Sequence, residues 1–596
     1  MQDMRGQGPL SQAEFEAMLR RWLLKVGARY VPVAIIGLAV ALIIAFVPTT
    51  QPQNGNGGGL AAGGGGGSGG RSGATGPTAA GPGGSVAGGP GVTGGGGIPA
   101  APPPPPGIGS SAGITNGNYA AGSTTGVAKT GVRCAAGARQ FGWSQYGPNC
   151  VAAFSGNNGG STAPGVTGST ITLSYRLANS QQQSAINALA GKANINQDDY
   201  VADLQSYINY FNSQFELYGR HVVLKTYQGQ GDYLEEDQGQ GLGATQADAV
   251  TVHDMPAFGD VTFTLEASQP YEEDLAAEHV IGFSSVALSQ NWFQQHAPYE
   301  YSVQGPSGTV GVQEAAAVVC RRMAGLPAIY AGDPLYQHST RKFGIIYPQT
   351  PEYQAEVNLY QQLIGQCGVK ANPVIGYTIN VSEYEQEAVS AMAQMKAAGV
   401  TTILCACDPI VPIFLTNAAD QQNYVPEWDS SFFGDPVGRD YDSKEWAHDI
   451  SGGFQWPALN TTEAYKTYEL GNPGHQPAEW PPSSPPYFYV PYYTLLHVFD
   501  GLQAAGPDLT PLTFERGMFS LPASNPGDFI GGKWRFGNQV YDPLISYSMA
   551  WWSPTATSAF DNTAGAYQWC NGGATYTYDN PAALGGPKQQ LACFGH

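Results

Sequence analysis

Apolar runs of strand length alternate with amphipathic helical segments between residues 342 and 421, and this is the clearest pattern in the chain. The predicted strands cover residues 342–347, 374–379 and 401–407, and the predicted helices cover 352–366, 384–398 and a segment from about 410. Strands without polar alternation, separated by helices, are typical of a parallel sheet that is covered on both faces. Ligands of such sheets bind outside the carboxyl ends of the strands, so residues 347–353 and 408–409 are where we expect chemistry.

A similar but less regular pattern precedes this region. The predicted strands are 170–175, 221–227, 261–265 and 280–283, and the predicted helices are 198–217, 240–253, 271–277 and 309–323. Apolar residues three and four apart place one face of each helix against the sheet. After the second region come helices at 489–505 and 510–518, and then residues 531–537 and 546–552, which we predict to form a β-hairpin at a sheet edge. The chain is therefore expected to contain two α/β halves.

The first 130 residues have a different character. Residues 30–47 carry no charge and are long enough to span a bilayer, and the basic residues in front of them place residues 1–29 in the cytoplasm. A cleaved secretory signal is the alternative interpretation. Residues 48–130 consist almost wholly of Gly, Ala, Pro, Ser and Thr, which cannot bury enough apolar surface to fold. We therefore expect a cell-membrane protein with a single N-terminal transmembrane helix and a disordered linker that leads to an extracellular domain.

The net charge and the cysteines bear on the partners of the protein and on the compartment in which it folds. A net charge of −20 with only 26 basic residues argues against nucleic acid as a partner. Eight cysteines without a Cys-x-x-Cys pair fit disulfides in an oxidising compartment better than zinc. The candidate pairs are Cys134 with Cys150, Cys320 with Cys367, and Cys570 with Cys593. For Cys405 and Cys407, two apart on a predicted strand, buried thiols are favoured over a bridge.

Catalysis has little support in the sequence. The chain shows no Gly-x-Ser-x-Gly elbow, no His-Glu-x-x-His pair and no Walker loop. We therefore expect no enzyme, no cofactor and no metal site.

The order of the later motifs resembles that of type I periplasmic binding proteins, in particular the leucine-binding-protein-like class that serves branched-chain amino acid ABC transporters. The resemblance covers residues 166–555. It is carried by residues 165–171 before the first strand, 395–400 before a strand of the second half, 423–426 after its helix, and 491–506 near the end. Residues 134–162, with a Cys-bounded loop and Asn158-Gly-Gly-Ser-Thr162, also resemble actinobacterial members of this class.

The resemblance implies an α/β fold of two lobes joined by a hinge, each a parallel sheet with helices on both faces. Lobe 1 would comprise about 166–308 and 455–530, and lobe 2 about 309–454 and 531–555. A disulfide-clasped segment, 131–165, would precede them, and a Cys-closed tail, 556–596, would follow.

The resemblance also implies ligand-binding residues at the strand ends. The positions that match are Ser268, Ser284, Ser285, Tyr353, Asp408 and Asp435. Hydroxyls of lobe 1 would meet a carboxylate, and the acids of lobe 2 would meet an ammonium group. Leu288 stands where a threonine is expected. Structural alternatives exist as well: Ser268 and Asp408 could cap helices, Tyr353 could pack on its own helix, and Asp435 could lie in a turn.

The function that follows is that of an extracellular solute-binding protein anchored in the membrane. It would capture a small polar ligand, such as an amino acid, an amide or a related organic solute, and deliver it to an ABC permease. The alternative is a membrane-tethered receptor or cell-wall interaction protein that uses the same fold without transport. The identity of the ligand depends on side chains that the sequence alone does not position.

Overall fold

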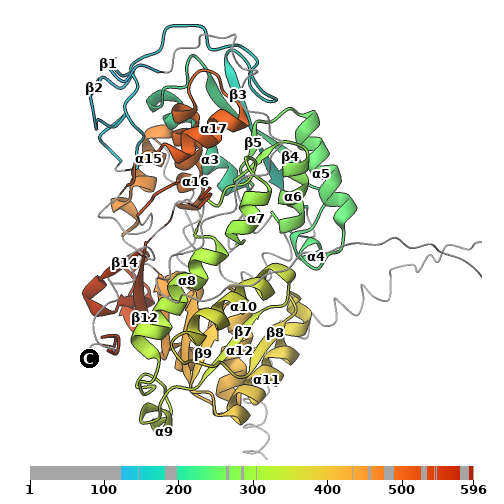
Figure 1. Ribbon diagram of the computed structural model, residues 1–596, viewed down its shortest axis with the longest axis vertical. Coiled ribbons are helices and arrows are strands. Elements are labelled where there is room, and N and C mark those ends of the chain that lie inside the picture. Colours follow the sequence, from blue (N-terminus) through green and yellow to red (C-terminus); the bar gives the residue numbers. More distant parts are fainter. Residues whose placement is uncertain are drawn as a thin grey trace, which may run out of the picture. The chain divides into compact units, whose positions relative to one another are not determined.

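The described residues form two α/β lobes (Figure 1). The computed structural model describes residues 122–594 with gaps at 145, 180–181, 183–196, 263–266, 284–287, 304, 432–433, 454–457, 475–488, 525–532, 538, 543, 545 and 578–588. The predicted cytoplasmic segment, the membrane helix at 30–47 and the linker as far as 121 lie outside these residues. In the part of the chain that is described, no helix has the length and apolar character needed to cross a bilayer.

Regular structure is already present upstream of the predicted boundary at residue 131. Strand β1 (Gly126–Val127) pairs antiparallel with β2 (Arg133–Cys134). The backbone N–H of Ala153 donates to the carbonyl of Val127 at 2.9 Å, so this small sheet is tied to the segment that follows the Cys134–Cys150 bridge.

Lobe 1 contains a four-stranded parallel sheet. Its order is β4-β3-β5-β6, with bounds His221–Gln228 for β4, Thr170–Leu177 for β3, Gly259–Asp260 for β5 and Ile281–Gly282 for β6. Strand β5 ends at Asp260, one residue before the start of the strand predicted at 261–265. Residues 261 and 262 have already left the ladder, although the N–H of Val261 still donates to Ser174 at 2.9 Å.

Lobe 2 repeats the same order in a larger sheet. Its parallel part runs β8-β7-β9-β10-β11, with bounds Val374–Tyr377 for β8, Phe343–Pro348 for β7, Thr402–Cys405 for β9, Glu427–Ser431 for β10 and Asp449–Gly453 for β11. These strands confirm the expectation of a doubly wound parallel sheet. Three antiparallel strands extend it: β12 (Ser546–Thr557), β13 (Ala564–Trp569) and β14 (Thr575–Thr577).

The position of β12 corrects two predictions. Residues 531–537 and 546–552 do not form a hairpin in the described residues, because β12 pairs with β11, β13 and β14, and Trp534 makes only isolated bridges to Ser524 and Leu544. The segment 556–596, predicted as a separate tail, therefore adds strands to the sheet of lobe 2. Tyr567 of β13 packs in the same apolar core as Ala550 and Trp552 of β12.

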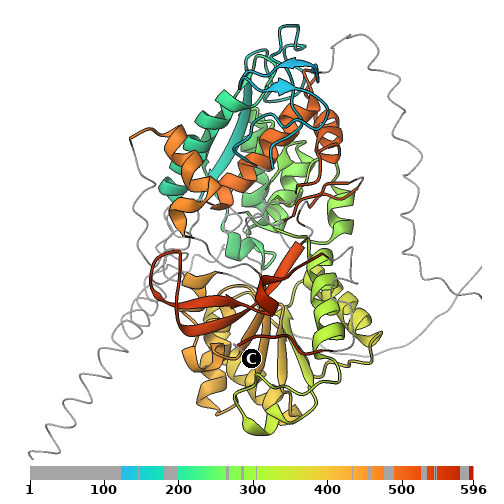
Figure 2. The same cartoon turned by 90° about the vertical axis from the view of Figure 1, so that its left-hand side faces the viewer.

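Helices cover both faces of each sheet (Figures 1 and 2). In lobe 1 they are α3 (Gln197–Gln214), α4 (Tyr233–Glu236), α5 (Leu242–Asp254), α6 (Gln269–Ala277), α7 (Gln290–Gln295), α15 (Glu463–Gly471), α16 (Tyr489–Ala505) and α17 (Pro511–Phe519). In lobe 2 they are α8 (Gly308–Val318) with a π-helical turn (Val319–Met323), α9 (Pro334–Gln337), α10 (Pro351–Gly365), α11 (Val381–Ala398), α12 (Val411–Gln421), α13 (Asp435–Gly438) and α14 (Ser443–Trp446). Helix α16 packs on α3, although the two are far apart in sequence.

Strand β9 shows why its sequence has no polar alternation. Ile403 and Cys405 belong to the core beneath α11 and α12, while Leu404 belongs to the core on the opposite face, which includes residues of α8 and α10. Since both faces are buried, every position of the strand is apolar or small.

The chain passes between the lobes three times: before α8, between β11 and α15, and between α17 and β12. The first and third passages are joined by hydrogen bonds, because the N–H of Ser302 donates to the carbonyl of Tyr541 at 3.0 Å and the N–H of Ser307 donates to the Asp542 carboxylate at 2.9 Å. Two of the three connections between the lobes are therefore bonded to each other.

Four disulfides are present. The predicted pairs Cys134–Cys150, Cys320–Cys367 and Cys570–Cys593 are all formed. The prediction of free thiols at Cys405 and Cys407 is wrong, because these two residues are bridged. In a fully extended strand, residues two apart are separated by about 6.8 Å. Strand β9 ends at Cys405, and the turn that follows brings the two Cα atoms to 5.1 Å.

Glu445 makes the stability of the protein depend on pH. It is buried in α14, and this burial raises its pKa from an ordinary value of 4.5 to about 8, against the smaller opposing effects of Trp428 and Lys444. Between these two values the folded state keeps a proton that the unfolded state releases, so stability falls as pH rises through this window. We expect the free energy of unfolding of Glu445→Gln to rise relative to that of the wild type by roughly 1 kcal/mol per pH unit between pH 5 and 8.

Urea unfolding of both proteins across this pH range measures the difference. Glu385→Gln, at an exposed position of α11, is the control and should track the wild type. A constant difference between Glu445→Gln and the wild type at all pH values would contradict the prediction.

Candidate functional site

The strand order identifies one place in each sheet where a ligand site is expected. The order reverses between β3 and β5 in lobe 1 and between β7 and β9 in lobe 2, and the crevice at the carboxyl ends of such strands is the usual site in doubly wound sheets. Leu177 and Asp260 end the two strands of lobe 1, and Pro348 and Cys405 end those of lobe 2. The candidate site is expected at these ends and at the ends of the neighbouring strands, β4 in lobe 1 and β8 in lobe 2.

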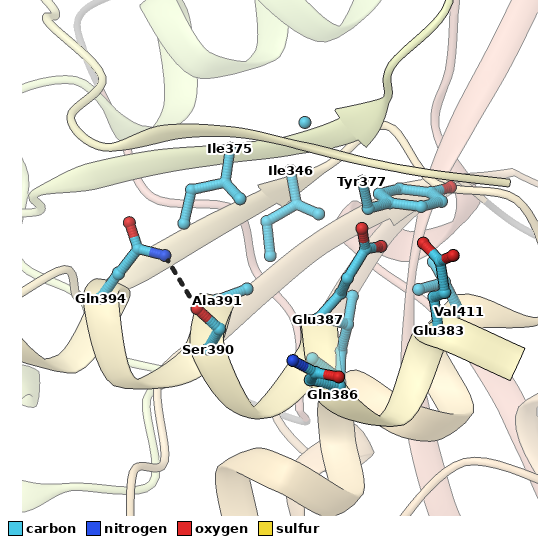
Figure 3. A pocket seen from close by; sticks show the side chains of 13 residues that line it. Ile346, Ile375, Tyr377, Glu383, Gln386, Glu387, Ser390, Ala391, Gln394 and Val411 are labelled. Atoms are coloured by element: carbon cyan, nitrogen blue, oxygen red, sulfur yellow. Dashed lines mark hydrogen bonds between the residues drawn. The ribbon is translucent and has the colours of Figure 1, made fainter. Parts of the chain in front are cut away.

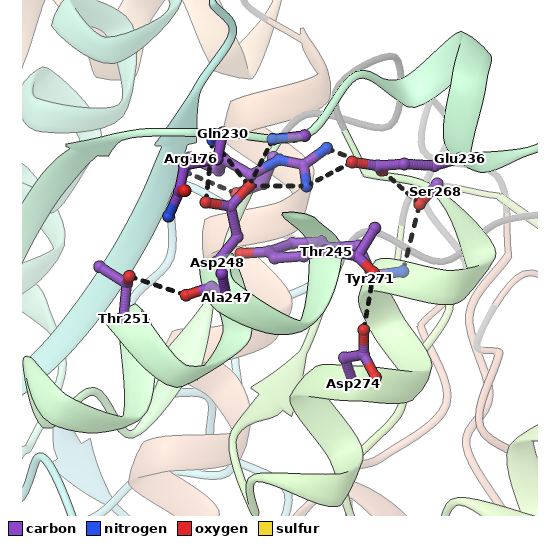
Figure 4. A network of polar contacts seen from close by, with 12 residues as sticks. Arg176, Gln230, Glu236, Thr245, Ala247, Asp248, Thr251, Ser268, Tyr271 and Asp274 are labelled. Carbon is purple, nitrogen blue, oxygen red and sulfur yellow. Dashed lines mark hydrogen bonds and ion pairs between the residues drawn. The ribbon is translucent and has the colours of Figure 1, made fainter. Parts of the chain in front are cut away.

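In lobe 1 a buried ion-pair network lies at the carboxyl end of β3 (Figure 4). The Arg176 guanidinium donates to both oxygens of Glu236, at 3.0 and 3.1 Å, and to Asp248 at 3.4 Å. The hydroxyl of Ser268 donates to Glu236 at 2.6 Å, and the ring of Tyr271 lies 4.2 Å from the guanidinium carbon. The network fastens the single turn of α4 to the sheet, because Glu236 is the last residue of α4.

Helix α4 places Tyr233 and Asp237 on either side of this anchor. Asp232 caps the helix by accepting hydrogen bonds from the N–H groups of Leu234 and Glu235. Burial raises the pKa of Asp237 to about 6, although the hydroxyl of Tyr233 and the N–H of Gln269 favour the charged carboxylate. Burial also raises the pKa of Tyr233 well above its ordinary value, and Asp237 adds to this. The Tyr233–Asp237 pair is therefore a half-buried polar group held at the lobe 1 edge.

In lobe 2 the corresponding group is centred on Asp408. One carboxylate oxygen accepts from the hydroxyls of Tyr377 at 2.7 Å and Tyr384 at 3.0 Å, and the other accepts from the N–H groups of Ile410 at 2.7 Å and Val411 at 3.1 Å. Asp408 thus accepts from the N–H groups at the start of α12, although Ile410 and not Asp408 is the N-cap residue of this helix. These hydrogen bonds hold the Asp408 side chain just beyond the end of β9, where the phenol rings of Tyr377 and Tyr384 lie beside it.

Side chains of the two lobes influence one another at this place. Burial raises the pKa of Tyr353, on the first turn of α10, and the charges of Asp237 from lobe 1 and Asp408 from lobe 2 raise it further. The pKa of Tyr233 is raised in part by Tyr353 and Asp408. Beyond the effect of burial, the charges of Asp237 and Asp408 both raise the pKa values of Tyr233, Tyr353 and Tyr384, so these residues, with Tyr377 bonded to Asp408, form one electrostatically linked group to which both lobes contribute. We call it the tyrosine–carboxylate cluster.

The other predicted ligand residues have different surroundings. Ser268 is buried, and its hydroxyl also accepts from the N–H of Tyr271 at 3.1 Å, so it caps α6 as the structural alternative proposed. Ser284 and Ser285 lie outside the described residues. The structure thus brings Tyr353 and Asp408 together and ties Ser268 to the Arg176 network nearby.

Asp435 lies away from this cluster. It is buried at the start of α13, where the N–H of Tyr567 in β13 donates to it at 2.9 Å. Burial raises its pKa to about 6 against the hydrogen bonds from Ser558 and Tyr567 and the charge of Arg439. These partners all come from lobe 2, and they fasten α13 to β13. The structural alternative therefore accounts for Asp435.

A pocket of about 460 Å³ opens inside lobe 2, between β8 and α11 (Figure 3). Ile346, Ile375 and Tyr377 line its sheet side, and Glu383 and Gln386 stand on the exposed side of α11. It has no lining residue from lobe 1. A ligand there would not hold the two lobes together.

Sequence reasoning missed Tyr233, Asp237, Tyr377 and Tyr384. A weak signal existed for the first pair, because Asp232 followed by Tyr-Leu-Glu-Glu is an N-cap before a helical turn, placed after a predicted strand. Tyr377 is the final residue of β8 and could have been selected by its place at a strand end. Nothing in the sequence shows that these residues meet.

Within the described ranges, no group of three or more His, Cys, Asp or Glu side chains is arranged to hold a metal ion. The tyrosine–carboxylate cluster offers phenol rings, hydroxyls and carboxylate oxygens to a polar organic molecule.

Asp408→Ala tests how much this carboxylate organises the site. The variant removes the acceptor at the start of α12, which costs about 1 kcal/mol as the loss of a helix cap does, and takes an acceptor from two buried tyrosine hydroxyls, at about 1 kcal/mol or more each. We therefore expect a loss of about 3 kcal/mol in urea unfolding.

Asn380→Ala is the matched control, because Asn380 caps α11 through the N–H of Ser382 and has no tyrosine partner. Its expected loss is about 1 kcal/mol. Equal losses for the two variants would show that Asp408 acts at the start of α12 alone.

Similarity to known proteins is found among solved structures. No protein-family model matches the chain, and no curated protein matches it either. Among solved structures, an ABC transporter substrate-binding protein from Aeropyrum pernix is similar at 8% identity and a TM-score of 0.49, covering 70% of this chain and 99% of that one. A leucine-, isoleucine-, valine-, threonine- and alanine-binding protein from Brucella ovis matches at 13% identity and a TM-score of 0.48, over 71% and 98% of the two chains.

A fatty acid ABC transporter substrate-binding protein from Thermomonospora curvata matches at 12% identity and a TM-score of 0.46, over 68% of this chain and 93% of its own. All three likenesses have identities of 13% or less and TM-scores below 0.5.

Proposed function

We propose that this protein is an extracellular solute-binding protein that captures a small polar ligand between its lobes and delivers it to an ABC-type permease. The observation that carries the proposal is the tyrosine–carboxylate cluster, because both lobes supply it at the carboxyl ends of their sheets. A ligand that contacts both lobes favours the closed arrangement, and closure by a hinge is how such proteins report that they are loaded.

The ligand class follows from the side chains at the strand ends. The loops at 228–241, 348–352 and 406–411 contain acids but no Lys or Arg, whereas the sequence between β3 and α3 contains Lys192. The Arg176 guanidinium nearby is bound to Glu236 and Asp248. Carboxylates and phenol faces together attract an organic cation, through charge and through the ring quadrupole. The proposed ligand therefore carries a positively charged amine or ammonium group.

The proposed setting comes from the N-terminal sequence. Residues 30–47 would anchor the protein in the cell membrane with residues 1–29 in the cytoplasm, and the linker that follows would hold the lobes outside the membrane. The permease would be a separate chain. No catalytic step is proposed.

A panel of ligands tests the binding function directly. Thermal unfolding of the full chain is followed with choline, putrescine and lysine as cations, leucine as a zwitterion, and 4-hydroxybenzoate as an anion. A ligand present at about 100 times its Kd should stabilise the folded state by roughly 2.7 kcal/mol. We expect the cations to raise Tm and the anion to leave it unchanged. A stabilising anion would contradict the ligand class, and a response only to a wall polymer or a protein would favour the receptor alternative over transport.

The pH dependence of binding provides a sharper prediction. Asp237 has its pKa raised to about 6, so it becomes charged as pH rises through this value. A cation should therefore bind more tightly at pH 7.5 than at pH 5, by about tenfold, as isothermal titration calorimetry can measure. Asp237→Asn should bind weakly and with no such dependence. Asp232→Asn, which changes the cap of the same helix, is the control and should keep the pH dependence of binding. If Asp237→Asn showed the same pH dependence as the wild type, the Asp237 carboxyl group would have no role in it.

A further inference from the structure

The Cys405–Cys407 disulfide lies at the candidate site, unlike the other three bridges. Cys405 is the last residue of β9, which lies beside β7 at the place where the strand order reverses. Cys407 directly precedes Asp408. Cys134–Cys150 joins the small β1–β2 region, Cys320–Cys367 joins the ends of two helical segments, and Cys570–Cys593 closes the C-terminal segment.

Fold stability does not explain a bridge of this size. In the loop-entropy account, the stabilisation by a disulfide grows with the logarithm of the closed loop. The sequence separation is 2 for Cys405–Cys407, against 16, 23 and 47 for the other bridges. The short bridge therefore restrains the unfolded chain least, and its main effect is local, on the backbone between β9 and α12.

This backbone positions the acid of the tyrosine–carboxylate cluster. The N–H of Asp408 donates to the Tyr377 hydroxyl at 2.9 Å, and the N–H of Ala406, inside the bridged loop, donates to the carbonyl of Ile346 in β7 at 3.0 Å. The bridge thus closes a turn that is fastened at both ends, and Asp408 is the first residue beyond it. Opening the bridge frees the torsion angles that set where this carboxylate stands.

We infer that the Cys405–Cys407 disulfide is a redox-dependent clasp of the ligand cleft: when oxidised it holds Asp408 in place for the ligand, and when reduced by a dithiol it releases the turn and weakens binding while the lobes stay folded. The binding part of this inference rests on the proposed function. The clasp itself rests on the position of the bridge.

The exchange chemistry needs only a dithiol as reductant. Cys407 is the more exposed residue of the pair, at 9% against 3% for Cys405, so its sulfur is the one attacked. A thiolate of the dithiol bonds to the Cys407 Sγ and breaks the Cys405–Cys407 bond, and the Cys405 Sγ leaves as a thiolate and takes up a proton. The second thiol of the dithiol then attacks the mixed disulfide and releases the Cys407 thiolate, which is protonated. The dithiol supplies two electrons and leaves as a disulfide.

Graded reduction of the full-length protein tests the clasp. The protein is treated with increasing dithiothreitol, alkylated with iodoacetamide and digested for mass spectrometry, and amide hydrogen exchange is measured in parallel. We expect alkylation of Cys405 and Cys407 at a dithiothreitol concentration that leaves the more deeply buried Cys134–Cys150 and Cys570–Cys593 bridges closed, while the more exposed Cys320–Cys367 bridge opens as well. At that concentration the amides of Ile410 and Val411, which donate to Asp408, should exchange about tenfold faster, while the Asn380-capped amide of Ser382 should keep its rate.

A variant separates the clasp from general destabilisation. Cys405→Ala/Cys407→Ala should show the fast exchange at Ile410 and Val411 without any reductant, with Tm close to that of the wild type and a Kd for the best cation of the panel raised about tenfold. Cys134→Ala/Cys150→Ala should lower Tm and leave both exchange and Kd unchanged. If Cys405→Ala/Cys407→Ala does not fold, the wild-type protein reduced with dithiothreitol is measured in its place.

Two results would overturn the clasp: unchanged exchange at Ile410 and Val411 after the bridge is opened, or opening of the bridge only when the whole domain unfolds. If no cation of the panel binds the oxidised protein, the proposed ligand class fails, and the exchange measurement still decides whether the bridge holds Asp408.

Discussion

Burial of both faces of each parallel sheet is the constraint on which the rest of the structure depends. Because helices cover both sides, every position of a strand such as β9 must be apolar or small, and most polar chemistry is displaced to the strand ends. Two arginines that enter the interior are each paired with an acid: Arg176 binds Glu236 in lobe 1, and Arg341 binds Glu427 at 2.7 Å in lobe 2. Such pairs avoid the cost of an isolated buried charge.

The two arginine pairs act at opposite ends of their sheets. Arg341 precedes β7 and Glu427 begins β10, so this pair joins the amino ends of strands in lobe 2. Arg176 lies near the carboxyl end of β3, where it anchors α4 and thereby the residues that face lobe 2. The first pair supports the fold, whereas the second also positions the candidate site.

The sequence predicted much of the site's framework and little of its composition. Tyr353 and Asp408 were found because they follow buried strands, a position where parallel sheets collect polar groups. Asp435 also follows a strand, β10, but its carboxylate is bonded to the backbone of β13. The sequence placed the residues of β13 in a C-terminal tail, so this contact was not expected. Tyr233 and Asp237 were missed because a single helical turn has almost no periodicity to detect.

By itself, the sequence predicted the alternation of strands and helices and three of the four disulfides, and it offered helix caps at Ser268 and Asp408 as alternatives to ligand binding. These depend on local periodicity, on short-range hydrogen bonds and, for the cysteines, on position along the chain. Only the tertiary structure decided that β13 joins the lobe 2 sheet, that Cys405 and Cys407 are bridged, and that Asp237 and Asp408 lie at one site. Each of these depends on where a strand ends or on which distant segments meet, and a linear pattern carries neither kind of information, because many chain paths satisfy the same periodicity.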